Sequence, residues 1–221
     1  MNKFIRKTMI DFYYLSGSPF TWRVWLALEH KALKYKRIEL SLEKGDLKSD
    51  SYLALNPRGK VPVIVDGDFS IYESGVILEY LEEKYPDFGA HLFPKDIQSR
   101  TLSRRLINEI DCYLWPTGMR LLMATFFTPK EKWDEAKISN ALAGVLAEFK
   151  RFDDYFSHNI GNDALTSVEF SMFPIVALMF RIEERKKDLG FSQAVNPELT
   201  RWFTALSGLS VFQSTRPQHW S

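Results

Sequence analysis

The hydrophobic pattern of this 221-residue chain changes near its middle from one that alternates strands and helices to one that is helical throughout. The first part contains short runs of β-branched and aromatic residues, such as residues 10–15, beside amphipathic helical segments. The stretch that follows, residues 86–94, holds two prolines and Gly89 and is typical of a linker. The sequence therefore predicts an α/β domain over residues 8–86, followed by an all-helical domain over residues 95–221.

The expected order of elements in the first domain is β-α-β-(α)-β-β-α. Ser18 is a candidate N-cap for its first helix, because Pro19 follows in the first turn. In the second domain, Pro116 interrupts the first helical pattern, while Thr166 and Glu169 have the spacing of a capping box. The expected strands are residues 10–15, 35–40, 61–65 and 69–72, and the expected helices are residues 22–30, 73–84, 97–127, 130–156, 166–185 and 197–206, with a loop and short helix over 44–51.

Composition argues against several classes of protein. A net charge of +1 gives no electrostatic footprint for nucleic acid or an acidic membrane. The longest apolar run, residues 170–180, is shorter than the roughly 20 residues of a membrane span, and no apolar stretch follows the basic start at residues 1–6. The single cysteine excludes an intrachain disulfide, and the four histidines show no metal-ligand spacing. We therefore expect a cytoplasmic protein without a metal, nucleic-acid or membrane partner, whose many aromatic rings can line an apolar pocket.

Three motifs occur in the α/β part: Ser-Pro-Phe-Thr-Trp-Arg-Val at residues 18–24, Asn-Pro-Arg-Gly-Lys-Val-Pro-Val at 56–63 and Glu-Ser-Gly-Val-Ile-Leu-Glu-Tyr-Leu at 73–81. In this order, and with the two-domain organisation, they resemble the cytosolic glutathione transferase family from about residue 9 onward. Residues 44–49 are similar to the theta class, which uses a serine, and the Ser-Pro-Phe block is similar to the omega class, with serine in place of cysteine. The resemblance implies a bacterial, serine-type enzyme with a thioredoxin-like glutathione-binding domain and a helical domain for the second substrate.

Such an enzyme directs the glutathione thiolate at an electrophilic, mainly apolar small molecule. A free thiol has a pKa near 8.5, so the protein must favour the anion. Ser18 is the candidate donor to the sulfur, because it stands where a strand gives way to a helix and where the helix dipole also favours negative charge. A role as N-cap is compatible with this, since a hydroxyl both donates and accepts. Ser16 is a rival, and Tyr13 and Tyr14 are weaker candidates because both lie inside the expected strand.

The resemblance also assigns contacts to the rest of glutathione. In the family, Pro62 follows a cis bond that turns the backbone of Val61 toward the cysteinyl part of glutathione, although trans is the more frequent form of an X–Pro bond. Ser74, which could equally cap the last helix of the domain, would hold the γ-glutamyl carboxylate, and Glu73 would face the ammonium. Lys48 and Lys60 would face the glycyl carboxylate. The ring of Phe20 is a further expected contact with glutathione.

One departure from the theta pattern concerns Leu47, which stands where a histidine is common and which we expect to weaken the hold on glutathione. The second-substrate site is less clearly marked, because a stripe of methionine and aromatic residues at helical spacing is more often core than pocket. Cys112, in the same region, is expected to be a small buried apolar residue. The candidates for the second-substrate pocket are Phe20, Tyr113, Trp115, Pro116, Met119, Arg120, Met123 and Trp220.

Two other functions compete with conjugation in detoxification. Disulfide reduction or isomerisation is disfavoured, because relatives that exchange disulfides carry cysteine at position 18 and the zeta-class isomerase has Ser-Ser-Cys in place of residues 18–20. A non-catalytic binding or regulatory protein would be expected to have a degraded glutathione site. The family pattern further implies an isologous homodimer with contacts near Tyr72, Arg104 and Arg105.

Overall fold

The computed structural model describes residues 9–159 and 165–220, which form two compact units. The first unit comprises residues 9–93 together with 215–220, and the second comprises the described residues between them. The expected domain start at residue 8, the basic start of the chain and Ser221 lie outside the described residues. The sequence placed the C-terminal tail in the helical domain, whereas residues 215–220 group with the first unit.

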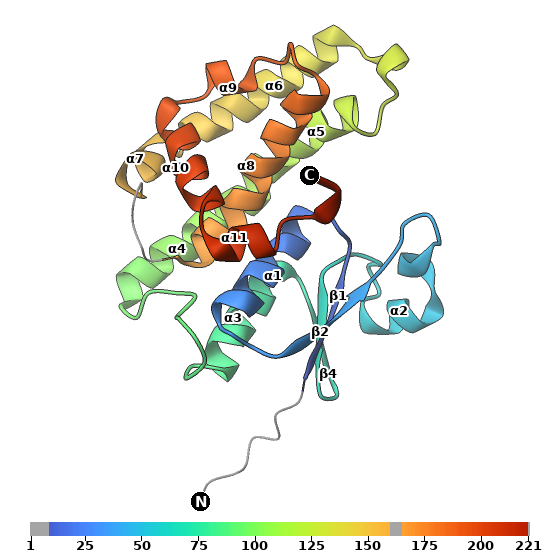
Figure 1. Ribbon diagram of the computed structural model, residues 1–221, viewed down its shortest axis with the longest axis vertical. Coiled ribbons are helices and arrows are strands. Elements are labelled where there is room, and N and C mark those ends of the chain that lie inside the picture. Colours follow the sequence, from blue (N-terminus) through green and yellow to red (C-terminus); the bar gives the residue numbers. More distant parts are fainter. Residues whose placement is uncertain (1–8, 160–164, 221) are drawn as a thin grey trace, which may run out of the picture. The chain divides into compact units, whose positions relative to one another are not determined.

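The first unit has a thioredoxin-like fold built on a four-stranded mixed sheet in the order β2-β1-β3-β4 (Figure 1). β1 runs parallel to β2 and antiparallel to β3, and β3 pairs with β4 as a hairpin. On β1 the side chains of Ile10, Phe12 and Tyr14 are buried and those between them are not, which is the two-residue period of a strand. The strands are β1 (Ile10–Tyr14), β2 (Tyr35–Glu39), β3 (Val63–Asp66) and β4 (Phe69–Tyr72).

The helices α1 (Pro19–His30) and α3 (Ser74–Lys84) lie side by side on one face of this sheet, and α2 (Asp50–Leu55) lies on the other side (Figure 1). α1 begins three residues earlier than expected, because Pro19 itself occupies the first helical position. Ser18 is its N-cap, as predicted, and its side-chain oxygen accepts a hydrogen bond from the backbone N–H of Thr21 at 3.4 Å. β3, in contrast, begins two residues later than expected, since Pro62 has no N–H to donate to a ladder.

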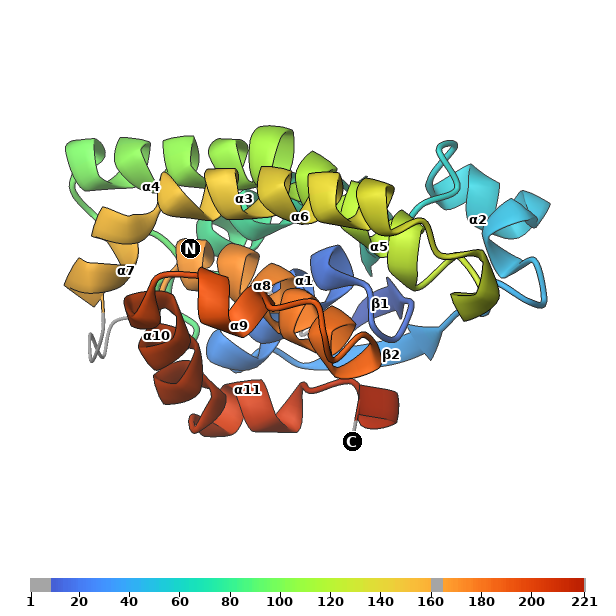
Figure 2. The same cartoon turned by 90° about the horizontal axis from the view of Figure 1, so that it is seen from above.

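The second unit is entirely helical in its described part. α6 runs alongside the rod formed by α4 and α5, and α8 packs against both α4 and α5 (Figure 2). α8 is buried along most of its length and begins with the predicted capping box of Thr166 and Glu169. The single helix expected over 130–156 is two helices, α6 and α7. The short helices α9 and α11 were not predicted, because they have too few residues for a periodic signal. The helices are α4 (Ile97–Glu109), α5 (Trp115–Thr125), α6 (Glu135–Lys150), α7 (Asp153–Asn159), α8 (Ser167–Arg185), α9 (Phe191–Ala194), α10 (Pro197–Ser207) and α11 (Ser210–Ser214).

The irregularity in the long helix over 97–127 lies one turn earlier than Pro116. A π-helical turn at Ile110–Leu114 joins α4 to α5, and Pro116 is the second residue of α5, directly after this turn. Cys112 lies within this turn and is exposed, so the expectation of a buried cysteine was wrong. The reason is local: Ile110 and Leu114 are the fully buried residues of the turn, and Cys112, midway between them, faces outward. No helix in the described part of the chain is long and apolar enough to span a membrane.

Candidate functional site

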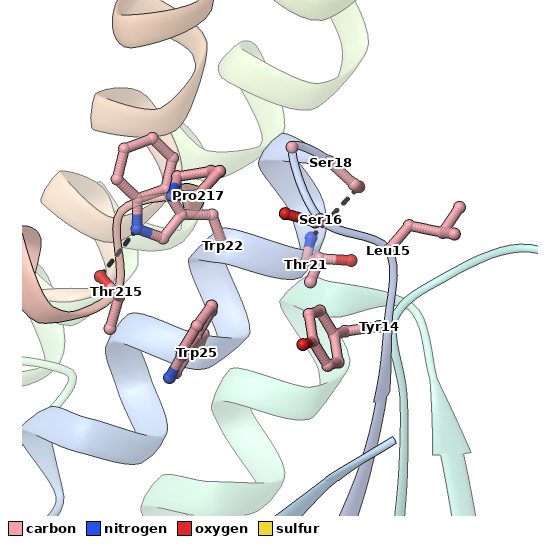
Figure 3. A pocket seen from close by; sticks show the side chains of 10 residues that line it. Tyr14, Leu15, Ser16, Ser18, Thr21, Trp22, Trp25, Thr215 and Pro217 are labelled. Carbon is pink, nitrogen blue, oxygen red and sulfur yellow. Dashed lines mark hydrogen bonds between the residues drawn. The ribbon is translucent and has the colours of Figure 1, made fainter. Parts of the chain in front are cut away.

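A tight turn between β1 and α1 forms one side of a small pocket in the first unit (Figure 3). The turn is closed by a hydrogen bond of 3.3 Å from the N–H of Ser18 to the carbonyl of Leu15, and Gly17 within it has a φ of +86°, which favours glycine. The pocket is lined by residues of β1, the turn, α1 and the C-terminal tail: Tyr14, Leu15, Ser16, Gly17, Ser18, Thr21, Trp22, Trp25, Thr215 and Pro217.

Ser18 is half-buried at the N-terminus of α1. Its oxygen accepts the N–H of Thr21, and no other hydrogen bond of its hydroxyl is formed within residues 9–159 and 165–220. The capping bond uses a lone pair of the oxygen, so the hydroxyl hydrogen stays available as a donor. The dipole of the twelve-residue α1 favours negative charge at the same place.

The two tyrosines of β1 are engaged differently. The phenol of Tyr14 donates to a carboxylate oxygen of Glu39 at 3.2 Å, and both burial and Glu39 raise its pKa. Burial and the nearby Asp11 likewise raise the pKa of Tyr13. A raised pKa keeps each phenol protonated, and the hydroxyl of Tyr14 already donates to a protein acceptor. Tyr14 is therefore not free to donate to a thiolate in this arrangement.

The C-terminal tail supplies part of the pocket wall. The indole N–H of Trp22 donates to the hydroxyl of Thr215 at 2.8 Å, and the ring of Trp220 packs edge-on against that of Trp22 with centroids 5.4 Å apart. The Oγ of Ser16 lies 3.0 Å from Nδ1 of His219. Sequence reasoning named Trp220 as a second-substrate residue, but it did not find the contact of His219 with the turn, because the tail has no periodic pattern.

The start of α3 holds a second buried hydroxyl. Ser74 is the first helical residue and is 7% exposed, while the preceding Glu73 occupies the N-cap position with a φ of 70° and no side-chain cap. The alternative that Ser74 caps this helix was therefore wrong. Instead, its oxygen accepts a hydrogen bond of 3.0 Å from Nη1 of Arg23, a residue of α1 that is 1% exposed. The sequence signal for this contact was a lone arginine among the apolar residues of α1, and it was not recognised.

The loop before β3 is held by two side chains that bond to its backbone. The Val61–Pro62 bond is cis, as the resemblance implied. The carbonyl of Lys60 accepts hydrogen bonds from the phenol of Tyr52 at 2.7 Å and from the amide of Asn56 at 2.8 Å. These two bonds fix the backbone immediately before Val61.

The remaining expected contacts lie at the surface of the first unit. The side chains of Lys48 and Lys60 are exposed, and Lys48 closes a 3-10 helical turn at Asp46–Lys48. Leu47 lies in the same turn, and a Cβ added to Gly59 would lie only 2.9 Å from the carbonyl oxygen of Leu47. Phe20 lies on α1 with the guanidinium of Arg23 5.1 Å from its ring centroid.

The second-substrate candidates are divided between the units. Trp220 belongs to the first unit and is buried against Trp22. Phe20 lies on α1 of the same unit. The other candidates lie on the π-helical turn and α5, and those with the most exposed apolar side chains are Tyr113 at 62% and Met123 at 51%. The rest of this group is half-buried or exposed: Trp115, Pro116, Met119 and Arg120. In the described part of the chain, no three histidine, cysteine or acidic side chains are grouped as metal ligands.

Comparison with known proteins agrees with this fold. A family model described as the N-terminal domain of glutathione S-transferase matches residues 12–89. The chain is 42% identical over 199 residues to glutathione S-transferase Z1 of Arabidopsis thaliana, which covers 89% of this chain and 86% of the relative. It is 32% identical over 212 residues to a zeta-class glutathione S-transferase of Euphorbia esula, covering 87% of this chain and 92% of the relative.

A solved glutathione transferase from Burkholderia graminis, whose structure has two glutathione molecules bound per subunit, superposes with a TM-score of 0.83. The two proteins are 21% identical, and the match covers 94% of this chain and 87% of the solved one. Such a likeness supports the two-part fold, and the sequence relatives add the identity of the family over most of the chain. On these grounds the chain is an enzyme of the glutathione S-transferase family.

Proposed function

We propose that this enzyme is a serine-type glutathione transferase in which the hydroxyl of Ser18 stabilises the glutathione thiolate. The observation that carries the proposal is the state of this hydroxyl: its oxygen is occupied by the N–H of Thr21, and its hydrogen is left for an acceptor at the pocket. The serine type agrees with the theta- and omega-like motifs of the sequence. The N-terminus of α1 adds favourable electrostatics at the same point.

The energetic effect of one such bond is sufficient. A hydrogen bond to a charged group contributes about 1.5–3 kcal/mol, and one pKa unit corresponds to about 1.36 kcal/mol. A single donor from Ser18 therefore lowers the pKa of the bound thiol by roughly one to two units. Starting from a pKa of about 8.5, this makes the thiolate the major form near neutral pH.

The γ-glutamyl end of glutathione would lie at the start of α3. Arginine can only donate, so its bond to Ser74 occupies the oxygen and leaves the serine hydrogen free to bind a carboxylate. In the described residues, Ser74 forms no other side-chain hydrogen bond. Arg23 thus acts as a positioning residue for Ser74, while Glu73 would face the ammonium group of the ligand.

The remaining contacts follow the family pattern. The backbone of Val61, held before β3 by the preceding cis-proline loop, would pair with the cysteinyl part of glutathione. Lys48 and Lys60 would face the glycyl carboxylate, and Phe20 would border the site. The glutathione bound in the Burkholderia graminis enzyme supports glutathione as the co-substrate of this protein.

In the reaction, the thiol loses its proton to solvent on binding, and the sulfur electron pair forms a bond to an electrophilic carbon. The leaving group departs with the electron pair of the bond that breaks.

We assign the second-substrate pocket to Tyr113, Trp115, Met119, Arg120, Met123 and Trp220, and we expect a cytoplasmic, detoxifying homodimer. Isomerisation is the second candidate, favoured by the zeta-class relative, but Pro19 and Phe20 stand where that class has Ser-Cys.

The test compares three reactions of the purified enzyme: conjugation of glutathione to a chlorinated nitroaromatic compound, reduction of a small mixed disulfide, and isomerisation of a maleyl compound. We expect conjugation to dominate, with an apparent pKa of the bound thiol well below that of free glutathione. Dominant disulfide reduction or isomerisation, or a bound thiol with the pKa of the free one, would contradict the proposal. Binding of S-methyl glutathione serves as a control that the glutathione site itself is intact.

A further inference from the structure

The C-terminal tail, residues 215–220, is built into the first unit. Thr215 is fully buried and Trp220 is 7% exposed, and both contact Trp22 of α1. The tail is also braced internally, because Nη2 of Arg216 donates to the carbonyl of Trp220 at 2.8 Å. It is therefore a fixed part of the pocket wall.

Gly17 shows how closely the tail approaches the turn between β1 and α1. A Cβ at this position would lie 3.0 Å from Nε2 of His219 and 3.2 Å from Nε1 of Trp220. Glycine is thus required at position 17 both by its backbone conformation and by the packing of the tail. The turn and the tail fit each other without room for a side chain between them.

The hydrogen bonds of His219 determine which of its ring nitrogens carries the proton. The indole nitrogen of Trp220 can only donate, and it donates to Nε2 of His219 at 3.0 Å. Nε2 is therefore the acceptor, and in a neutral imidazole the proton must then lie on Nδ1. Nδ1 lies 3.0 Å from the Oγ of Ser16, so His219 donates this bond and Ser16 accepts it.

Ser16 consequently keeps its hydroxyl hydrogen for another acceptor. Within the two described segments of the chain, the side chain of Ser16 bonds to His219 alone. Ser16 and Ser18 line the same pocket (Figure 3). Both serines thus have an oxygen occupied by a protein donor and a hydrogen available for a ligand.

We propose that Ser16 is a second hydroxyl donor of the thiol pocket and that His219 is its positioning residue. His219 does not line the pocket, and it orients the Ser16 hydroxyl through the bond from Nδ1. The inference rests on the proposed function, because it concerns the same thiolate that Ser18 stabilises. It makes the C-terminal tail part of the glutathione-activating site.

The test measures the pH–rate profile of conjugation for wild type, Ser16→Ala, His219→Ala and the double variant. Because Ser16 would donate to the same charged sulfur as Ser18, loss of its bond corresponds to about a 10- to 100-fold effect. We expect each single variant to lower the rate by this factor below the pKa of the bound thiol and to approach the wild-type rate at higher pH. Because His219 acts through Ser16, the double variant should be no slower than Ser16→Ala.

Two further variants separate positioning from packing. His219→Asn keeps an N–H donor near the position of Nδ1 and should recover most of the wild-type profile. His158→Ala changes an exposed histidine of α7 and should leave the profile unchanged. Substituting the exposed His219, rather than deleting the tail, preserves the buried Trp220.

The proposal is overturned if His219→Ala lowers the rate equally at all pH values, or if its effect persists in the Ser16→Ala background. It is also overturned if His219→Asn behaves like His219→Ala. Failure of the proposed function would look different, because wild type itself would then show no lowering of the thiol pKa.

Discussion

Replacing Ser18 with alanine tests the central feature of the site. The substitution removes two interactions of one hydroxyl: the capping bond from Thr21 N–H and the proposed bond to the glutathione sulfur. The capping bond is long, at 3.4 Å, so its loss should lower the free energy of unfolding by at most about 1 kcal/mol. The fold should therefore remain intact.

The effect on the thiol should be larger. A hydrogen bond to a charged sulfur contributes about 1.5–3 kcal/mol, which corresponds to a rise of roughly one to two units in the pKa of the bound thiol. Conjugation near neutral pH should fall about 10- to 100-fold and should largely recover at higher pH. The KM for glutathione should change less, because Ser74, Val61 and Glu73 hold other parts of the tripeptide.

The assay is the pH–rate profile of conjugation with one aromatic electrophile, together with a direct spectroscopic titration of the bound thiol. Ser49→Ala is a matched control, since Ser49 caps α2 through a bond of 3.3 Å from Tyr52 N–H. It should cost a similar amount of stability without moving the profile. If Ser18→Ala leaves the profile unchanged while Ser16→Ala shifts it by more than one unit, Ser16 is the main donor and our assignment is wrong.

Three further predictions concern binding and stability. Ser74→Ala should raise the dissociation constant of S-methyl glutathione about tenfold or more by calorimetry without shifting the thiol pKa, since it removes one bond to a carboxylate; an unchanged affinity would contradict the assignment. Lys31→Met should lower the free energy of unfolding in urea by about 3 kcal/mol, because Lys31 is fully buried and pairs at 3.0 Å with Glu82, whose buried carboxylate would keep only its bonds to His91 and to the N–H of Leu92. A loss below about 1 kcal/mol would refute this reasoning. Burial opposes a charged Glu82, but the N–H of Leu92, Lys31 and His91 lower its pKa below the ordinary value of 4.5. The contribution of Glu82 to stability is therefore present above pH 4.5 and is lost as the pH falls through the lower pKa of the folded state. Glu82→Gln should accordingly flatten the acid side of the stability profile measured by urea unfolding at a series of pH values.

Local chemistry explains what could be predicted from the sequence. The start of α1 follows from a serine followed by proline, and the start of α8 follows from the spacing of Thr166 and Glu169. The strands of the first unit follow from two-residue alternation, as in β1. Each of these signals acts within a few residues, so it survives in the sequence without knowledge of the fold.

Other features depend on contacts that the local sequence does not encode. The π-helical turn at Ile110–Leu114 has the same apolar spacing as the α-helix around it, and the outward position of Cys112 follows from that turn. The positive φ of Glu73 occurs at a residue type that rarely adopts it, so only the fold reveals it. The tail was placed with the helical part because helices precede it, whereas its buried Thr215 and Trp220 contact α1 of the first unit.

The three serines of the site differ in how much of their role the local sequence reveals. Each of them accepts a hydrogen bond from the protein and thereby keeps its hydrogen for a ligand, but the donors lie at very different distances along the chain. The donor to Ser18 is 3 residues away, the donor to Ser74 is 51 residues away, and the partner of Ser16 is 203 residues away. The sequence correctly predicts that Ser18 is an N-cap. It identifies Ser74 as a binding residue but does not indicate that Arg23 donates to it, and it does not indicate that His219 is the partner of Ser16. A protein donor that bonds to the oxygen of a serine orients the hydroxyl hydrogen toward a ligand. The chemical role of a serine therefore depends on this donor, which the local sequence reveals only when the donor is a few residues away.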